Sequence, residues 1–244
     1  MKTKMWKSMI AAIVILPMTL VSCHDEFMIG ISGQGDMVEQ TINPDLFDGF
    51  VSNIAAEIYL TQGAEQLVVV EAQQNIIDNL DLDHIDSGIW TIRYHEPVRF
   101  AKPVKIYITI PTLTKAGING SGEITGLTPF TNLDQLKLFI AGSGGMNLNT
   151  ESKEMNVTVT GSGDVSMVGK TDQLSLIVSG SGSFHGPDYV TRRAEMTVSG
   201  SGSARLTVDE FLQVIVSGSG DVYYYGDPEI DKHISGSGSV VRGH

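Results

Sequence analysis

Disulfide bonds are excluded by the cysteine content of this sequence. Its 244 residues include one cysteine, Cys23, so the chain cannot form a disulfide within itself. Small exported domains often depend on such bonds. We therefore expect packing and hydrogen bonding alone to stabilise the fold.

Basic residues are also scarce. Sixteen Lys and Arg residues stand against 28 Asp and Glu residues, giving a formal net charge of -12. Loss of residues 1–22 would remove three lysines and bring the charge to about -15. Such a chain is a poor match for nucleic acid or for anionic lipid headgroups, and we expect no nucleic-acid partner.

Long apolar runs are confined to the start of the chain. Lys2, Lys4 and Lys7 precede an apolar run of about a dozen residues, which is shorter than the ~20 needed to span a bilayer. The run is typical of a secretory signal. The sequence Leu-Val-Ser-Cys that follows resembles a bacterial lipobox, with Cys23 as the lipidated residue.

This resemblance implies an outer-membrane lipoprotein that contacts the membrane through its lipid anchor. Residues 1–22 are then the signal peptide, and residues 23–40 are a tether. The acidic pair in His24-Asp25-Glu26 is similar to surface-export signals of lipoproteins in the Bacteroides group. The leaflet and the face of the membrane stay open.

The tripeptide Gly-Ser-Gly is abundant instead, and it occurs seven times. Its first glycines are Gly120, Gly142, Gly161, Gly180, Gly200, Gly218 and Gly236. A period of 18 to 22 residues is typical of a solenoid, in which each coil stacks on the previous one. A flexible linker would show no such period.

The columns around the tripeptide predict strands. Two residues before each first glycine stand Ile118, Ile140, Val159, Val178, Val198, Val216 and Ile234, and two residues after each last glycine stand Ile124, Met146, Val165, Phe184, Ala204, Val222 and Val240. Small or polar residues separate these apolar columns from the glycines, and such alternation indicates β-structure. We predict an all-β, right-handed, single-stranded parallel β-helix with a Gly-Ser-Gly corner in each coil.

The preceding residues, 41–116, have the same character without the tripeptide. Strands are expected at 56–60, 66–70, 89–94 and 104–110, with a short helix at 75–80. Trp90 and Phe100 suit wider N-terminal coils or a cap. Residues 31–36 resemble one corner and are expected to form an extended strand linking anchor and body.

Three segments in this region carry a family resemblance: Phe47-Asp48-Gly49-Phe50-Val51, Ile58 to Gly63 and Leu67 to Ala72, followed by the run of corners. Together they resemble the head GIN domain family of adhesins from the Bacteroides group, over about residues 41–244. The resemblance implies a parallel β-helix, with 41–116 as its first section and 117–244 as the repeat coils, and it brings no catalytic residues.

Enzymatic readings find less support in these residues. The corners match neither a dinucleotide fingerprint nor a phosphate loop, and seven equivalent serines are unlike a single nucleophile. Carbohydrate cleavage is the main alternative, because Glu123 and Asp164 would lie two coils, or about 10 Å, apart. The basic residues are too scattered to form a substrate groove around them.

Metal and cofactor sites are not expected. The six histidines lie too far apart in sequence to suggest a ligand pair. Calcium could bind at the corners that continue with Asp164 and Asp221, although calcium β-rolls have half this period. Tyr223 and Tyr225 are the best candidates for stacking on a sugar, with packing between coils as the alternative.

We therefore expect a non-catalytic cell-envelope adhesin or interaction module that binds glycan or a host or envelope protein through a rigid surface. The alternatives are a polysaccharide lyase or hydrolase and a structural envelope protein. The sequence stops six residues after its last corner. We expect a second copy of the chain to cover the C-terminal coil.

Overall fold

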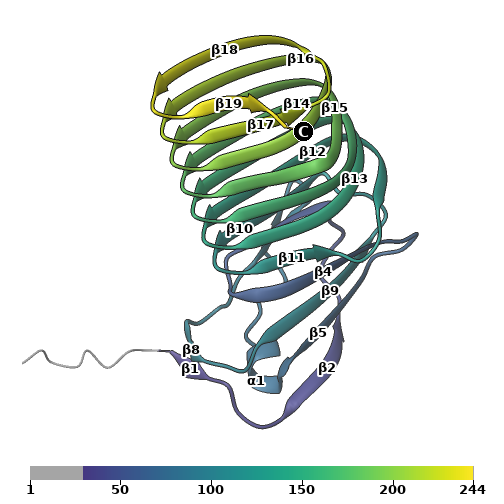
Figure 1. Cartoon of the computed structure of the whole chain (residues 1–244). Helices are drawn as coiled ribbons and strands as arrows, with labels where there is room; N and C mark the ends of the chain where they lie inside the picture. The colour runs from purple at the N-terminus through teal and green to yellow at the C-terminus, as the bar shows by residue number, and fades with distance from the viewer. Residues whose placement is uncertain (1–29, 244) are drawn as a thin grey trace, which may run out of the picture.

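The computed structural model describes residues 30–243, and these form a parallel β-helix on an N-terminal body (Figure 1). Cys23 and the signal segment lie outside the described residues. The N-terminal elements are β1 (Ile31–Ser32), β2 (Met37–Ile42), β3 (Gly49–Ser52), β4 (Ala56–Gln62), β5 (Leu67–Gln73), α1 (Gln74–Ile77), β6 (Ile85–Asp86), β7 (Ile89–Ile92), β8 (Val98–Phe100) and β9 (Val104–Ile110).

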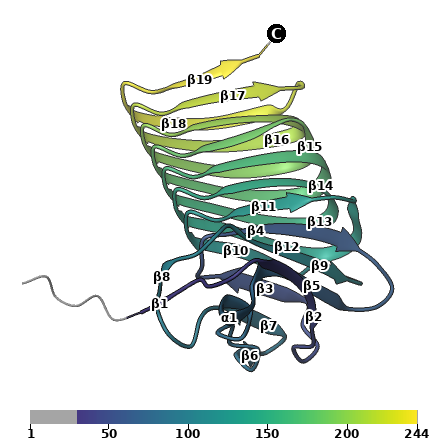
Figure 2. The same cartoon turned by 90° about the horizontal axis from the view of Figure 1, so that it is seen from below.

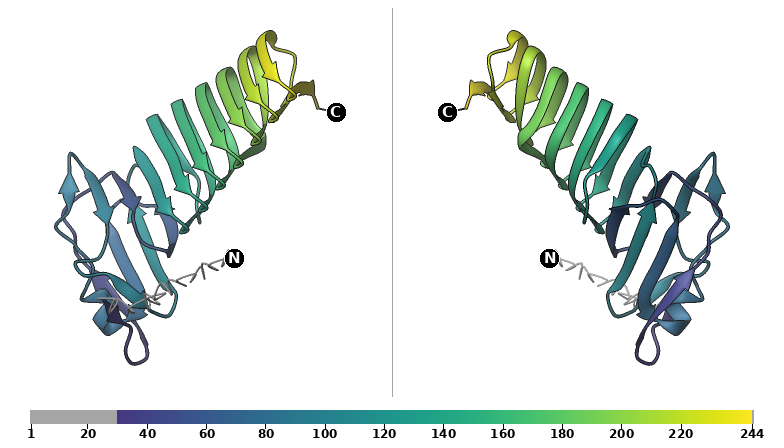
Figure 3. Two further views of the ribbon diagram at one scale, coloured as in Figure 1. Left: turned by 90° about the vertical axis from the view of Figure 1, so that its left-hand side faces the viewer. Right: turned by 90° about the vertical axis from the view of Figure 1, so that its right-hand side faces the viewer.

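The repeat forms the second part of the structure. Its strands are β10 (Lys115–Gly120), β11 (Glu123–Gly126), β12 (Phe130–Gly142), β13 (Gly145–Gly161), β14 (Asp164–Gly180), β15 (Ser183–Gly200), β16 (Ser203–Gly218), β17 (Asp221–Tyr225), β18 (Glu229–Gly236) and β19 (Ser239–Arg242). All of these pair in parallel with the coil before them, and the corner glycines align from Gly120 to Gly236. Figure 3 shows the coils stacked as a ladder. The predicted parallel β-helix is confirmed.

The two apolar columns form the core of this stack. Val178 before the corner and Phe184 after it are fully buried, and so are most of their counterparts in neighbouring coils. Ile234 differs, with 38% of its surface exposed, because it belongs to the last described coil. Each coil therefore buries its apolar residues only against the coils on either side.

The corner is held by the backbone of its serine. The N–H of Ser181 donates to the carbonyl oxygen of Gly161 in the preceding coil at 2.9 Å, and the same bond recurs at the neighbouring corners. The serine side chains themselves are exposed. The seven serines thus form a ladder of backbone bonds, with their hydroxyl groups on the surface.

The two corner glycines are required for different reasons. Gly180 has a φ of 118°, a backbone conformation that residues other than glycine rarely adopt. Gly182 needs space: a Cβ there would collide with the carbonyl oxygen of Gly163 and lie 2.7 Å from Cγ1 of Val159. Stacking of one coil on the next therefore depends on both glycines.

The N-terminal body joins the stack through β3 and β4, which pair in parallel with β10 and β11. On their other side they pair in parallel with β7 and β9. The next two strands are antiparallel, because β9 pairs with β5 and β5 with β2. This antiparallel pairing, which the sequence pattern did not indicate, caps the parallel stack (Figure 2).

Other N-terminal details differ from the sequence-based expectations. Residues 31–42, expected to lie mostly within the tether, pair with the body, since β1 pairs with β8 and β2 with β5. The helix is four residues long, with Ile76 and Ile77 buried. Trp90 is buried as expected, whereas Phe100 is 68% exposed and takes no part in the core. Phe100 belongs to the N-terminal section as expected, and it is exposed because it ends the three-residue strand β8.

Candidate functional site

One outward-facing column runs along the molecule from the N-terminal body to the last coils. The strand registers place its members side by side, one from each strand: Tyr107, Tyr59, Thr125, Asn147, Ser166, His185, Arg205 and Tyr223. We call this set the outward column. With strands about 4.8 Å apart, its seven steps cover roughly 34 Å.

Aromatic rings stand at both ends of the outward column, and beyond them the registers continue with Val69 and Val241. At the N-terminal end, Tyr59 and Tyr107 stack with ring centroids 5.0 Å apart and an interplanar angle of 15°. The Tyr59 hydroxyl donates to Glu57 at 2.9 Å, and this hydrogen bond raises the pKa of Tyr59. Sequence reasoning missed this pair, although both residues occupy outward positions of alternating strands.

Tyr223 and Tyr225 lie at the opposite end. Both project outward from β17 and are half-buried, and the guanidinium carbon of Arg205 lies 5.2 Å from the Tyr223 ring centroid. Gly243 packs against the ring of Tyr225. Tyr223 belongs to the outward column, whereas Tyr225 stands two residues farther along β17, beside Thr207 of the preceding coil.

Polar and cationic side chains occupy the middle of the outward column. Asn147, His185 and Arg205 are exposed, and Thr125 and Ser166 are partly exposed. Amide, hydroxyl, imidazole and guanidinium groups can all hydrogen-bond to sugar hydroxyl or carboxylate groups. Together with the terminal aromatic rings, they make a surface suited to an extended polar ligand.

The aspartates beside the corners have a structural role. Asp164 accepts hydrogen bonds from the backbone N–H and the hydroxyl of Ser183 in the next coil, and Asp221 does the same with Ser239. In the described residues no group of three or more His, Cys, Asp or Glu side chains could hold a metal ion. Each aspartate therefore links two coils.

The candidate pair for carbohydrate cleavage is two coils apart, as expected. Glu123 and Asp164 flank Gly145 in the register, and the bonds from Ser183 hold one oxygen of Asp164. Glu123 is exposed on the surface. The structure brings no basic side chain between these two carboxylates in the register, where Gly145 stands.

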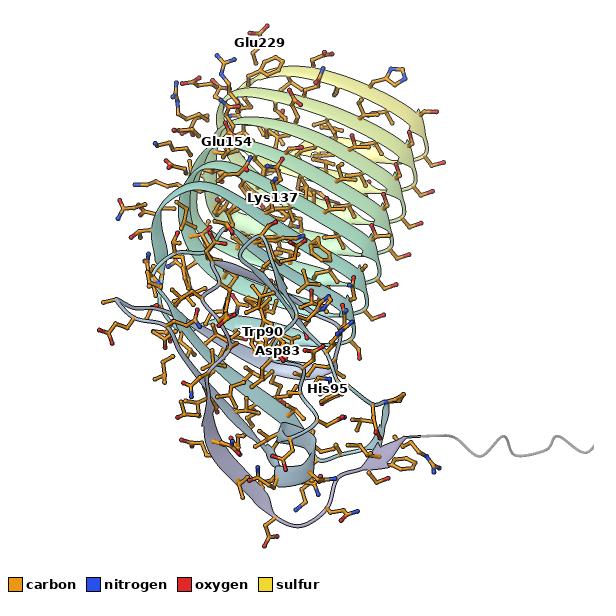
Figure 4. The ribbon with its side chains drawn as sticks, turned by 180° about the vertical axis from the view of Figure 1, so that it is seen from behind. Asp83, Trp90, His95, Lys137, Glu154 and Glu229 are labelled. Atoms are coloured by element: carbon orange, nitrogen blue, oxygen red, sulfur yellow. The ribbon has the colours of Figure 1, made fainter. Side chains whose placement is uncertain are left out.

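Three basic side chains of the repeat are instead paired along a ridge on another side of the coil. Lys153 lies 2.6 Å from Asp134, Lys170 lies 3.4 Å from Glu151, and Arg192 lies 2.7 Å from Glu210. Each pair connects one coil with the next and borders a groove of about 550 Å³. Figure 4 labels Lys137 and Glu154, two further charged residues on the solenoid.

The last described coil has an open edge. β18 pairs only with β16, and β19 pairs only with β17, among the strands that the structure describes. Nearly every residue of β18 is exposed, including Ile234. No helix within residues 30–243 is long and apolar enough to cross a bilayer.

The stacked parallel coils place the chain in the class of β-solenoid repeat proteins. The family model "Putative auto-transporter adhesin, head GIN domain" matches residues 46–228. The chain belongs to this family. Among curated proteins, the chain has no match.

Solved structures of three bacterial proteins share the fold. A putative adhesin from Bacteroides fragilis NCTC 9343 superposes with a TM-score of 0.80 at 22% identity, covering 88% of this chain and 100% of that one. A putative lipid binding protein from Parabacteroides distasonis ATCC 8503 superposes with a TM-score of 0.69 at 24% identity, covering 88% of this chain and 99% of that one. A putative adhesin from the same organism superposes with a TM-score of 0.72 at 18% identity, covering 88% of this chain and 100% of that one.

Proposed function

We propose that this protein is a non-catalytic adhesin that binds an extended glycan along the outward column. The observation that carries the proposal is the continuity of the column, with tyrosines at both ends and hydrogen-bonding side chains between them. Family membership supports the adhesin class. The glycan is inferred from the chemistry of the side chains.

Rigidity favours such a role. The parallel coils fix the spacing of the column, so a ligand would meet side chains that need little reordering. The Arg205 guanidinium beside Tyr223 adds a positive group to an otherwise acidic molecule. We therefore expect acidic glycans to bind more tightly than neutral glycans of equal length.

Binding of purified protein to an array of neutral and acidic glycans tests the proposal. The double variant Tyr59→Ala/Tyr107→Ala and the variant Arg205→Ala should each weaken binding by about tenfold, which is typical for loss of an aromatic or charged contact. Ile177→Ala is the matched control, because Ile177 is exposed on β14 but lies eleven residues beyond Ser166 and outside the outward column. Equal binding by all variants would contradict the assignment.

Polysaccharide cleavage remains the alternative function. It depends on the two-coil separation of Glu123 and Asp164. Incubation of the protein with the glycans that it binds should release no shorter chains. Turnover that is abolished by Glu123→Gln or Asp164→Asn would replace the adhesin proposal with an enzyme.

We further propose that the protein is an envelope lipoprotein anchored through Cys23. The support is the lipobox-like Leu-Val-Ser-Cys sequence after the apolar run. Metabolic labelling with an alkyne fatty acid should modify the wild-type chain, and Cys23→Ser should abolish the label. Protease treatment of intact cells then separates surface exposure from the periplasmic face.

The open edge of the last coil is the proposed contact with a second copy. An exposed edge strand presents unpaired backbone groups, and two identical edges can pair about a two-fold axis. Sedimentation of the wild type should reveal a dimer, and Ile234→Lys should shift it toward the monomer. A monomer at all concentrations would contradict this contact.

A further inference from the structure

The structure gathers cationic and aromatic side chains at the point where the chain enters the folded body. Gly30 and β1 lie directly against β8: the Ile31 N–H donates to Pro97 at 2.9 Å, and the Gly33 N–H donates to Phe100 at 2.7 Å. Between residues 8 and 92 the sequence has no Lys or Arg. The next eleven residues contain Arg93, Arg99 and Lys102.

Phe100 is the exposed apolar element of this cluster. Its side chain is 68% exposed, and the guanidinium carbon of Arg99 lies 5.6 Å from the ring centroid. Residues 95–103 are exposed except for Val98, which is partly buried. An exposed aromatic ring beside a guanidinium group is typical of segments that enter a membrane interface.

A hollow of about 720 Å³ is bordered by the residues on either side of Phe100, and its lining combines apolar with cationic side chains. Arg93, His95, Arg99 and Lys102 border it, with Glu96 as its single acidic residue among the described lining. Figure 4 shows His95 on the side of the molecule from which β1 enters.

The cations differ in how far they are already paired. Arg93 is bound to Asp81 at 2.8 Å, and Lys102 lies 4.0 Å from the exposed Asp36. Arg99 forms no ion pair with any residue in the described part of the chain. Arg99 is therefore available to an external phosphate, and Lys102, whose contacts with Asp36 and the Gly35 carbonyl oxygen are both on the surface, can exchange them for one.

We propose that β8 and the following residues, from Arg99 to Lys102, dock on the anionic lipid surface of the membrane that anchors the chain. This inference rests on the proposed anchor at Cys23. Gly30 lies seven positions after Cys23, so the entry point lies within about 25 Å of an anchored cysteine. Phe100 then enters the interface, and Arg99 and Lys102 contact lipid phosphates.

The low number of cations argues against membrane binding by the surface as a whole. The cluster around Arg99 and Lys102 is a local exception, and we expect it to bind anionic lipid. Acidic residues elsewhere are repelled by an anionic bilayer, while the cluster is attracted. Docking would therefore orient the body with β8 toward lipid. The C-terminal coil, at the other end of the stack, would point away (Figure 1).

Fluorescence of a tryptophan at position 100 tests this orientation. Residues 23–244 are coupled through the Cys23 thiol to a maleimide lipid, in vesicles of phosphatidylcholine alone or with an equal part of phosphatidylglycerol. Chemical coupling replaces the cellular lipid, so failure of Cys23 lipidation in cells leaves this test intact. Trp90 is buried and contributes a constant background.

The Phe100→Trp variant should show a blue-shifted emission on anionic vesicles and about twofold more quenching by brominated lipid than Val241→Trp. Val241 is exposed on β19, in the last coil, and is the matched control. Arg99→Glu/Lys102→Glu should abolish the difference. Equal quenching at positions 100 and 241, or quenching that survives the charge reversal, would overturn the proposal.

Discussion

Asp221 joins the last two coils by accepting two hydrogen bonds from Ser239, from its backbone N–H at 3.0 Å and from its hydroxyl at 2.6 Å. The same arrangement links Asp164 and Ser183 in the middle of the stack. An aspartate in this position therefore serves as a clamp between coils. The first prediction follows from its location at the open end.

Replacing Asp221 with Ala should loosen the last coil. The loss of two bonds to a charged acceptor is expected to lower local stability by about 1–2 kcal/mol. Hydrogen exchange at the amides of β19 should accelerate by about tenfold, whereas exchange in β14 stays unchanged. Ser237→Ala is the control, because the Ser237 bond to Gly218 uses the backbone N–H. Unchanged hydrogen exchange in β19 would contradict the role of Asp221 as a clamp between coils.

Gly182→Ala should be among the most damaging single changes in the repeat. Its Cβ would lie 2.7 Å from Cγ1 of Val159, and backbone atoms of the preceding coil leave no room for it. We expect a loss of about 3 kcal/mol in the free energy of unfolding. Denaturant unfolding should show this loss, while Ser181→Ala, at the exposed neighbour, stays within about 0.5 kcal/mol of the wild type. Similar midpoints for both variants would contradict the steric explanation.

Val178→Ala tests the inner column. Val178 is fully buried between coils, so removal of two methyl groups should cost about 2 kcal/mol. The adjacent Ile177 faces outward and is 41% exposed. Ile177→Ala should therefore cost less than half as much by the same denaturant measurement. The reverse order would mean that the strand faces are wrongly assigned.

The pair formed by Asp81 and Arg93 should make stability depend on pH. Hydrogen bonding from Arg93 holds the pKa of Asp81 below its ordinary value of 3.8. The pair therefore contributes stability above about pH 4, and this contribution is lost as the pH falls through the lowered pKa of the folded state.

Asp81→Asn should lower the free energy of unfolding by about 1 kcal/mol at pH 7, an amount reduced by the partial exposure of Arg93. The difference from the wild type should shrink toward zero below pH 4. Asp83→Asn, at an exposed residue, is the control. A constant difference from pH 7 to pH 3 would show that the ion pair is not its cause.

The repeat coils could be predicted because each one has the same arrangement of buried β-branched residues and corner glycines. β-branched residues such as Val178 and Val198 recur at fixed offsets from glycines, and both are buried. Because the pattern recurs, the strand and corner positions in one coil support the same positions in the others. The N-terminal body offers no such repetition, so the antiparallel pairing of β2, β5 and β9 depends on contacts between distant segments.

The candidate site was predicted in part. Tyr223 and Tyr225 do share an outward face, but their role in binding sugar stays a prediction. The Tyr59 and Tyr107 pair escaped notice because the two residues lie 48 positions apart in the sequence, although their strands are neighbours in the sheet. Phe100 was expected to suit wider N-terminal coils or a cap, and its exposure in the short strand β8 could not be predicted from the sequence.

The backbone bonds between coils, such as that from Ser181 to Gly161, run along the axis of the stack. A pulling force applied at the last coil would therefore open these bonds one coil at a time, like a zipper. The same force applied sideways, through a ligand lying across several strands of the outward column, would be shared among many coils at once. A ligand held along the flank would thus resist detachment by flow better than one held at the tip.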